Sequence, residues 1–152
     1  MGKKGIELKR IFLLVEGSDA GMRAAAYAVD LAQTLGASVH AVSVVETDTM
    51  SHLLSRSILV QSEMAELAKE MSQNARKHLD YVEGLCQQKW VPIETDQLEG
   101  SIHRSVLETL SESSYDLLIV GSYQATMTQR DLAAHEKQLI IESAPCPVLL
   151  VK

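Results

Sequence analysis

The side chains that could carry chemistry in this chain follow its apolar segments. They are Glu16, Ser18, Glu46, Ser101, His103, Arg104, Ser122 and Tyr123. A serine, a histidine and a carboxylate can be drawn from this set, and such a trio carries out acyl transfer in hydrolases. The chain has no Gly-x-Ser-x-Gly segment, however, which would hold a nucleophilic serine exposed on a strand-to-helix turn. We therefore expect none of these residues to be catalytic and the protein not to be an enzyme.

A glycine at position 121 marks the place where a nucleotide phosphate would bind. Gly121 and Ser122 follow the apolar segment 116–120, and a polar stretch and a helical pattern come next. Phosphates bind at strand-to-helix corners of this kind, because amides at the helix end point at the ligand and glycine lets the backbone approach it. Only one glycine stands at this corner. The sequence therefore keeps the framework of a nucleotide site but lacks most of its phosphate-binding residues.

The histidines and cysteines show none of the spacings typical of metal sites. Cys86 and Cys146 belong to no C-x-x-C segment, and no histidines are spaced as in H-E-x-x-H; they stand at positions 40, 52, 78, 103 and 135. We expect no bound metal and two reduced cysteines that serve as small apolar side chains. Sequence spacing leaves open whether three histidines meet in space.

Length and composition predict one domain, residues 1–152. Of the 152 residues, 46% are hydrophobic, 22% charged and 4% aromatic, and a chain of this length buries roughly two thirds of its unfolded surface. The apolar content comes from alanine, valine, leucine and isoleucine, which favours helices packed on a sheet. The net charge is −6, and an acidic chain without a basic patch is not expected to bind nucleic acid.

No segment is typical of secretion or of membrane insertion. The basic residues that precede position 11 are followed by a short apolar run that ends at Glu16. A helix needs about 20 apolar residues to cross a bilayer, and no run approaches that length. We expect a cytoplasmic protein.

Apolar periodicity predicts strands that alternate with helices. We expect strands at 10–16, 37–46, 91–98, 115–120 and 148–151, helices at 19–35, 60–86, 101–110 and 129–142, and a loop at 47–57. This alternation predicts an α/β domain in which helices cover both faces of a parallel sheet. Pro92 suits a strand at the sheet edge. Leu118 and Val120, in the most apolar strand, should be fully buried.

Several short motifs, taken in order, resemble the universal stress protein family over about residues 8–152. They are Val15–Ser18 after the first strand, Leu31–Ala32 and Gly36–Ala37 before Val44–Val45, Leu98–Gly100, Asp116–Ser122 and Ala144–Val148. The resemblance implies one three-layer domain around a five-stranded parallel sheet in the order 3-2-1-4-5. It also implies a homodimer formed through the last strand.

The resemblance breaks at the residues that bind ATP in this family. Members that bind ATP carry Gly-x-x-Gly, nine residues, and then Gly-Ser or Gly-Thr; here Gly121 is followed by Gln124, and the closing pair is Ala134–His135. The aspartate after the first strand is replaced by Glu16. A side chain at a left-handed position costs about 1–2 kcal/mol, and two lost hydrogen bonds cost about 1 kcal/mol each. Together these losses weaken binding by about two to three orders of magnitude.

Charged side chains in the former phosphate segment also disfavour a triphosphate. Asp131 and Glu136 would repel it, while Arg130 and Lys137 are expected to be solvated partners of neighbouring acids. A capping pattern that begins at Thr128 makes the segment a good helix, so the last helix should begin early.

Two functions from different classes fit these residues. The first is a homodimeric regulatory or interaction module with an unknown protein partner, without a cofactor, tight ATP binding or catalysis. The second is an adenine-nucleotide-binding stress protein that takes AMP or ATP in a remodelled pocket. In that case Glu16 would contact the ribose, the Val44 backbone the adenine and the Gly121 amide a phosphate, with Gly100 and Ser122 completing the site.

The closing segment predicts how two chains would meet. Val148–Val151 is apolar at four successive positions, yet the family order places this strand at the sheet edge. An apolar edge with unpaired backbone groups invites strand addition by another chain. Antiparallel pairing of two copies would satisfy both edges and leave none open.

Overall fold

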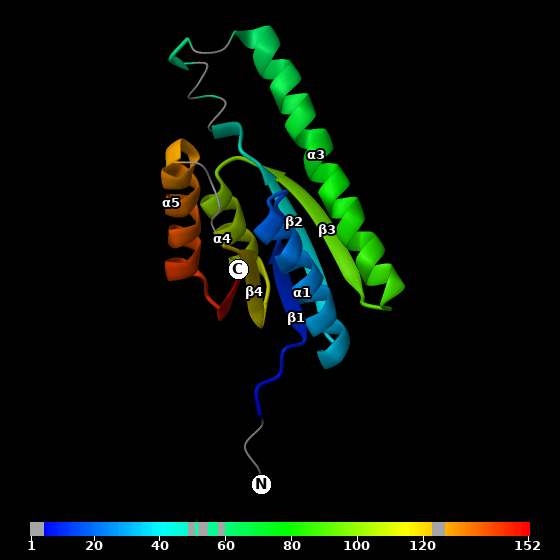
Figure 1. Cartoon of the computed structure of the whole chain (residues 1–152). Coiled ribbons are helices and arrows are strands. Elements are labelled where there is room, and N and C mark those ends of the chain that lie inside the picture. The colour runs from blue at the N-terminus through cyan, green and yellow to red at the C-terminus, as the bar shows by residue number, and fades with distance from the viewer. Residues whose placement is uncertain (1–4, 49–50, 52–54, 58–59, 123–126) are drawn as a thin grey trace.

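Strands and helices alternate along the chain in the computed structural model, which describes residues 5–48, 51, 55–57, 60–122 and 127–152 (Figure 1). The elements are β1 (Arg10–Leu14), α1 (Asp19–Leu35), β2 (Ser38–Val45), α3 (Gln61–Gln88), β3 (Ile93–Glu99), α4 (Ile102–Glu112), β4 (Leu117–Gly121), α5 (Met127–Ser143) and β5 (Val148–Val151). Among the described residues, no helix is both long and apolar enough to cross a membrane.

The strands form one parallel sheet in the order β3-β2-β1-β4-β5, which confirms the expected α/β fold. The central strands β1 and β4 are almost wholly buried, as expected for strands that helices cover on both faces. Leu118 is fully buried and Val120 nearly so, which confirms the prediction for that strand. The edge strands β3 and β5 are only partly buried.

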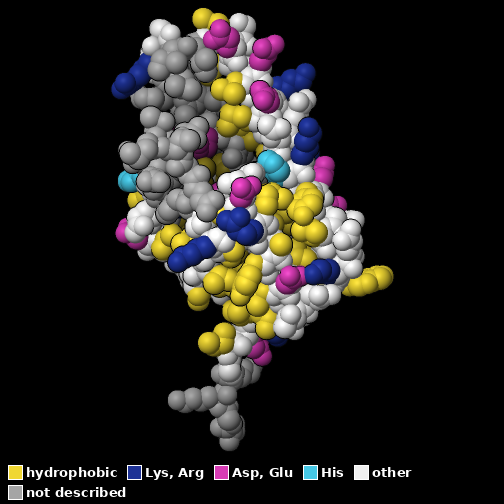
Figure 2. Space-filling model, viewed as in Figure 1, with side chains coloured by type: hydrophobic (Ala, Val, Ile, Leu, Met, Phe, Trp, Pro, Cys, Tyr) yellow, Lys and Arg dark blue, Asp and Glu magenta, His cyan; other side chains and the backbone are white. Residues whose placement is uncertain are grey.

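Each face of the sheet has its own apolar core. On one face, Ile11 and Leu13 of β1 pack with the alanine-rich side of α1 and with Leu79 and Val82 of α3. On the other face, Phe12 and Leu14 pack with residues of α4 and α5. Figure 1 shows these two helix layers, and α3 extends beyond the sheet at its amino end. Figure 2 shows acidic and basic side chains along α3 and hydrophobic ones lower on the same face, around α1.

Local signals at the helix ends set the loops at the carboxyl edge of the sheet. Ser18 caps α1 by accepting a hydrogen bond from the Gly21 amide at 3.0 Å, and Ser101 caps α4 in the same way. At the opposite edge of the sheet, Gly36 ends α1 in the left-handed conformation, with φ of 67°, before β2 begins. The Ser18 and Ser101 caps place the residues that follow β1 and β3 at the carboxyl edge.

Some predicted boundaries differ from the structure. The expected loop at 47–57 was partly wrong, because residues 47–48, 51 and 55 are helical. The first strand ends at Leu14, two residues before its predicted end, although the Val15 amide still donates to the Val42 carbonyl at 2.8 Å. The last helix begins at Met127, which confirms an early start.

Candidate functional site

A buried ion pair occupies the corner where β1 and β4 end. Lys137 reaches from α5, and its Nζ lies 2.8 Å from Oε2 of Glu16, the residue that follows Val15. The same Nζ donates a hydrogen bond to the Gly121 carbonyl at 2.7 Å. Lys137 is only 6% exposed. The ammonium therefore joins the two residues that would contact the ribose and a phosphate in the nucleotide-binding alternative.

Backbone packing explains why glycine stands at position 121. A Cβ atom built there would lie 2.7 Å from the Gly21 amide nitrogen and 2.9 Å from the Ala20 carbonyl oxygen, in the first turn of α1. A Cβ on Gly21 would in turn lie 2.6 Å from the Glu16 carbonyl oxygen. Both glycines are thus required by the close approach of α1 to the strand ends, whether or not a ligand binds.

Burial and like charges set the electrostatics of this corner. Burial raises the pKa of Glu16, although the Lys137 ammonium beside it acts in the opposite direction. Burial also raises the pKa of Glu46, and the carboxylates of Glu136, Glu16 and Asp48 raise it further. Carboxylates therefore gather at this edge, and they oppose the binding of a triphosphate.

A second polar group borders the corner between α4 and α5. Glu136 accepts a hydrogen bond from the His103 amide at 2.8 Å, and its Oε2 lies 2.5 Å from Nδ1 of the same residue. Nδ1 also lies 2.9 Å from Oγ of Ser101. These contacts satisfy the first turn of α4 from within the chain.

The remaining predicted site residues lie at the same edge but already bond to neighbouring strands. The Ser122 amide donates to the Val151 carbonyl at 2.8 Å, and the Gly100 amide to the Val45 carbonyl at 3.1 Å. Val44 lies within β2, opposite Leu98 of β3. Gly100 has a φ of 126°, which favours glycine. The structure thus brings Glu16 and Gly121 together through Lys137, while Val44 and Gly100 lie where β2 and β3 end.

The role of Lys137 was missed by sequence reasoning, which expected a solvated side chain. The residue is buried because α5 turns it toward the sheet, on the same face as Ile140 three positions later. That spacing was a usable signal, since a lysine in line with a fully buried isoleucine faces the core.

Gln124 lies outside the described residues. Position 134 lies within α5, and His135 is exposed.

Comparison with known sequences finds a matching family model and a related protein. A sequence model of the universal stress protein family matches residues 7–152. Universal stress protein MJ0531 from Methanocaldococcus jannaschii is 31% identical over 144 residues, which span 95% of this chain and 82% of that protein. The family-model match spans every described strand.

Solved structures share the fold at lower sequence identity. The protein MJ0577 superposes with a TM-score of 0.76 at 16% identity, covering 97% of each chain. A universal stress protein family protein from Arabidopsis thaliana, solved with AMP bound, superposes with a TM-score of 0.62 at 16% identity, covering 95% of this chain and 91% of that one. At these identities the likeness concerns the fold alone.

Proposed function

The chain belongs to the universal stress protein family, and we propose that it is a cytoplasmic regulatory or interaction module of this family that neither binds ATP tightly nor catalyses a reaction. The observation that carries this proposal is the ion pair between Lys137 and Glu16, which lies at the corner expected to hold a nucleotide. The chain supplies its own cation at this place, and the cation is bonded to protein groups on both sides.

Displacing Lys137 from Glu16 would cost free energy. A nucleotide that used Glu16 for its ribose would have to take that carboxylate from a buried ammonium, and leaving one partner of a buried pair alone costs about 3–5 kcal/mol. This cost is added to the weak phosphate contacts expected from Gln124, Ala134 and His135. Glu46 and Glu136 add negative charge at the same edge. The cost of displacing Lys137, the weak phosphate contacts and the nearby carboxylates all disfavour the binding of a triphosphate.

A smaller nucleotide is the second candidate ligand, and the AMP-bound relative from Arabidopsis thaliana supports it. A monophosphate carries less charge than a triphosphate, so the carboxylates repel it less. Lys137 is the one cation bonded to Glu16 among the described residues, and by turning away from Glu16 it could bind a monophosphate. Glu16, the Val44 backbone and the Gly121 amide would then take the ribose, adenine and phosphate roles, with Gly100 and Ser122 beside them.

Titration calorimetry separates these candidates. We expect no low-micromolar binding of magnesium-ATP to the unmodified protein, and mass spectrometry of small molecules released by denaturation should find no stoichiometric nucleotide. Stoichiometric AMP, or AMP binding that Lys137→Met weakens at least about 10-fold, would establish the second candidate. A low-micromolar dissociation constant for magnesium-ATP would refute the first.

We also propose that two copies pair through β5. This strand lies at the edge of the sheet, and its apolar Leu150 is 40% exposed. The Pro147 carbonyl accepts a hydrogen bond from the amide of Leu118 in β4, and the Val151 carbonyl accepts one from the amide of Ser122, which follows β4. Successive backbone groups of a strand alternate in direction. The backbone groups of Leu150 therefore point away from the sheet, where a second β5 strand could pair with them. An unknown protein partner would bind this dimer, and no nucleic acid is required.

A further inference from the structure

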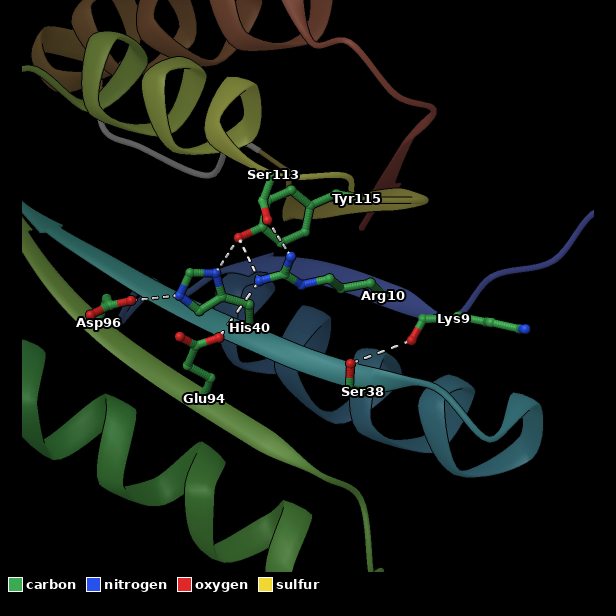
Figure 3. Close-up of polar contacts among 8 residues, drawn as sticks. All are labelled: Lys9, Arg10, Ser38, His40, Glu94, Asp96, Ser113 and Tyr115. Atoms are coloured by element: carbon green, nitrogen blue, oxygen red, sulfur yellow. Dashed lines mark hydrogen bonds and ion pairs between the residues drawn. The ribbon is translucent and has the colours of Figure 1, made fainter.

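A histidine lies buried between two polar partners at the opposite end of the sheet from the Lys137 corner. His40 is the third residue of β2 and is only 4% exposed. Its Nδ1 lies 2.5 Å from the Tyr115 hydroxyl, and its Nε2 lies 2.7 Å from Oδ2 of Asp96. Figure 3 shows the imidazole held between these two side chains. Nδ1 therefore faces the Tyr115 hydroxyl and Nε2 faces the Asp96 carboxylate.

Aromatic packing fixes the plane of this imidazole. The Phe12 ring meets the His40 ring edge to face, with centroids 5.6 Å apart, and meets the Tyr115 ring in the same manner at 5.3 Å. Tyr115 thus bonds Nδ1 and is itself packed against the core. In metal sites, a ligating histidine is oriented by a hydrogen bond to its other ring nitrogen. Here Nε2 is the nitrogen directed toward the acidic side chains.

Two carboxylates from the edge strand β3 lie beside that nitrogen. Glu94 is the register partner of His40, and Asp96 follows two positions later on the same face of the strand. One ligand atom from each of His40, Glu94 and Asp96 lies within 4.8 Å of the other two, and these residues are the one such group found among the described residues. A tetrahedral ion with bonds of about 2.0–2.2 Å separates its ligands by about 3.4 Å. The distance of 2.7 Å between Nε2 of His40 and Oδ2 of Asp96 is shorter than this separation, and the limit of 4.8 Å for the group is longer. Small rotations of the two exposed carboxylates would bring the three ligand atoms to the required separation.

The surroundings favour a cation. These residues line an open pocket of about 410 Å³, which Thr109, Glu112 and Ser113 of the α4 end also line. Three carboxylates face the pocket against the guanidinium of Arg10, so negative charge predominates. The free volume would let water or another ligand complete the coordination of an ion held by three protein atoms.

We propose that Nε2 of His40 and the carboxylates of Glu94 and Asp96 bind a divalent transition-metal ion, with Zn²⁺ as the best fit. An imidazole nitrogen selects zinc over the oxygen-preferring Mg²⁺ and Ca²⁺. Tyr115 is the positioning residue, since its hydroxyl accepts the Nδ1 proton when Nε2 binds the ion. The spacing of histidines along the sequence did not predict this site, because its carboxylates come from a different strand.

Arg10 competes with a bound cation for the Glu94 carboxylate. Its Nη2 lies 3.7 Å from Oε2 of Glu94, while its Nη1 donates to Ser113 and its guanidinium lies 4.4 Å from the Tyr115 ring centroid. A cation bound to Glu94 is repelled by this guanidinium. Removing the charge with Arg10→Gln should therefore tighten zinc binding, whereas a purely structural ion pair offers no reason for such a gain.

Titration calorimetry with ZnCl₂ in a non-chelating buffer tests the site. We expect one zinc ion per chain, unaffected by excess Mg²⁺. Glu94→Gln and Asp96→Asn change exposed side chains and should keep the fold, and each should weaken binding by at least about 10-fold, the loss typical of even an outer-shell partner. Tyr115→Phe should weaken it by about 10-fold. Asp80→Asn, in an exposed pair with Arg76 on α3, is the matched control and should leave binding unchanged.

Cobalt absorption provides a readout that separates this site from other histidines. Co²⁺ bound to His40 should give a visible spectrum that is lost in Asp96→Asn and kept in Asp80→Asn. The proposal is overturned if zinc does not bind, or if Glu94→Gln and Asp96→Asn bind it as Asp80→Asn does. The second result would assign the ion to another histidine or to the cysteines.

Discussion

Nζ of Lys137 lies 2.8 Å from Oε2 of Glu16, so a charge on the last helix neutralises a charge that follows the first strand. Both groups are largely removed from solvent, and each therefore depends on the other for compensation. The pair also connects α5 to the carboxyl ends of β1 and β4, because Lys137 donates to the Gly121 carbonyl as well.

Removing the ammonium should destabilise the fold. Lys137→Met leaves the Glu16 carboxylate unpaired, and we expect a loss of about 3–5 kcal/mol in the free energy of unfolding at pH 7. The double variant Glu16→Gln, Lys137→Met should recover most of that loss. Urea unfolding measures both. Lys89→Met, which breaks the exposed pair with Asp30, is the control and should cost about 1 kcal/mol or less. If Lys137→Met and Lys89→Met lower the free energy of unfolding equally, the Lys137 pair is not effectively buried.

The raised pKa values of Glu16 and Glu46 predict a loss of stability as pH rises. A carboxyl whose pKa is higher in the folded state binds more protons folded than unfolded. Its stabilising contribution is thus complete below the ordinary value of 4.5 and declines as pH rises through the folded pKa. Glu46→Gln removes one such group, so the variant should be more stable than the unmodified protein at pH 7, by a margin that shrinks toward pH 4.

Urea unfolding at several pH values measures this margin. Glu70→Gln on the exposed side of α3 serves as the control, because it removes the same charge away from the Glu16 corner. A Glu46→Gln margin that is constant with pH would contradict the assignment of the pH dependence to Glu46.

Leu118→Ala should show how firmly β4 is packed. Leu118 is fully buried between the helices and the sheet, so its truncation should cost about 2–5 kcal/mol in urea unfolding. Leu150→Ala, in the edge strand β5 with 40% of Leu150 exposed, is the matched control and should cost clearly less. A loss below about 1 kcal/mol for Leu118→Ala would be incompatible with a central buried strand.

Restoring the family's phosphate residues should create ATP binding. In the triple variant Gln124→Gly, Ala134→Gly, His135→Ser, the two glycines let the backbone amides approach a phosphate and the serine adds a hydroxyl. We expect a gain in magnesium-ATP affinity of about two orders of magnitude. Glycine at position 134 within α5 costs about 1 kcal/mol of stability, so circular dichroism must first confirm folding. If the folded triple variant gains no affinity, the missing glycines are not what limits binding, and the Lys137 pair becomes the stronger explanation.

Light scattering tests the β5 dimer. At micromolar concentration we expect twice the chain mass of 16.7 kDa. Leu150→Pro removes an outward-facing amide donor and should shift the protein toward monomer while sparing the sheet. Trp90→Ser, which removes a 92% exposed aromatic side chain away from β5, should leave the mass unchanged. A monomer in the unmodified protein would rule out this dimer.

The order of the strands shows what a local pattern can and cannot predict. Periodicity placed each strand and helix within a few residues, because the apolar face of each element must meet the core. It failed in part at 47–57, where polar residues gave no helical stripe although residues 47–48, 51 and 55 are helical. The order 3-2-1-4-5 came from resemblance to the family, since periodicity contains no information about which strands are neighbours.

The same division applies to the sites. By itself the sequence determined the α/β elements, the glycine corner at Gly121 and the residues missing from a phosphate loop, because these depend on neighbours along the chain. Tertiary structure alone decided that Lys137 fills the corner beside Glu16 and that His40 meets Asp96 and Tyr115. Residues so far apart in sequence meet only through the pairing of strands and the angle at which a helix packs on them. The pairing of strands and the packing angle of a helix depend on contacts throughout the core, between residues far apart in sequence, and no local pattern specifies them.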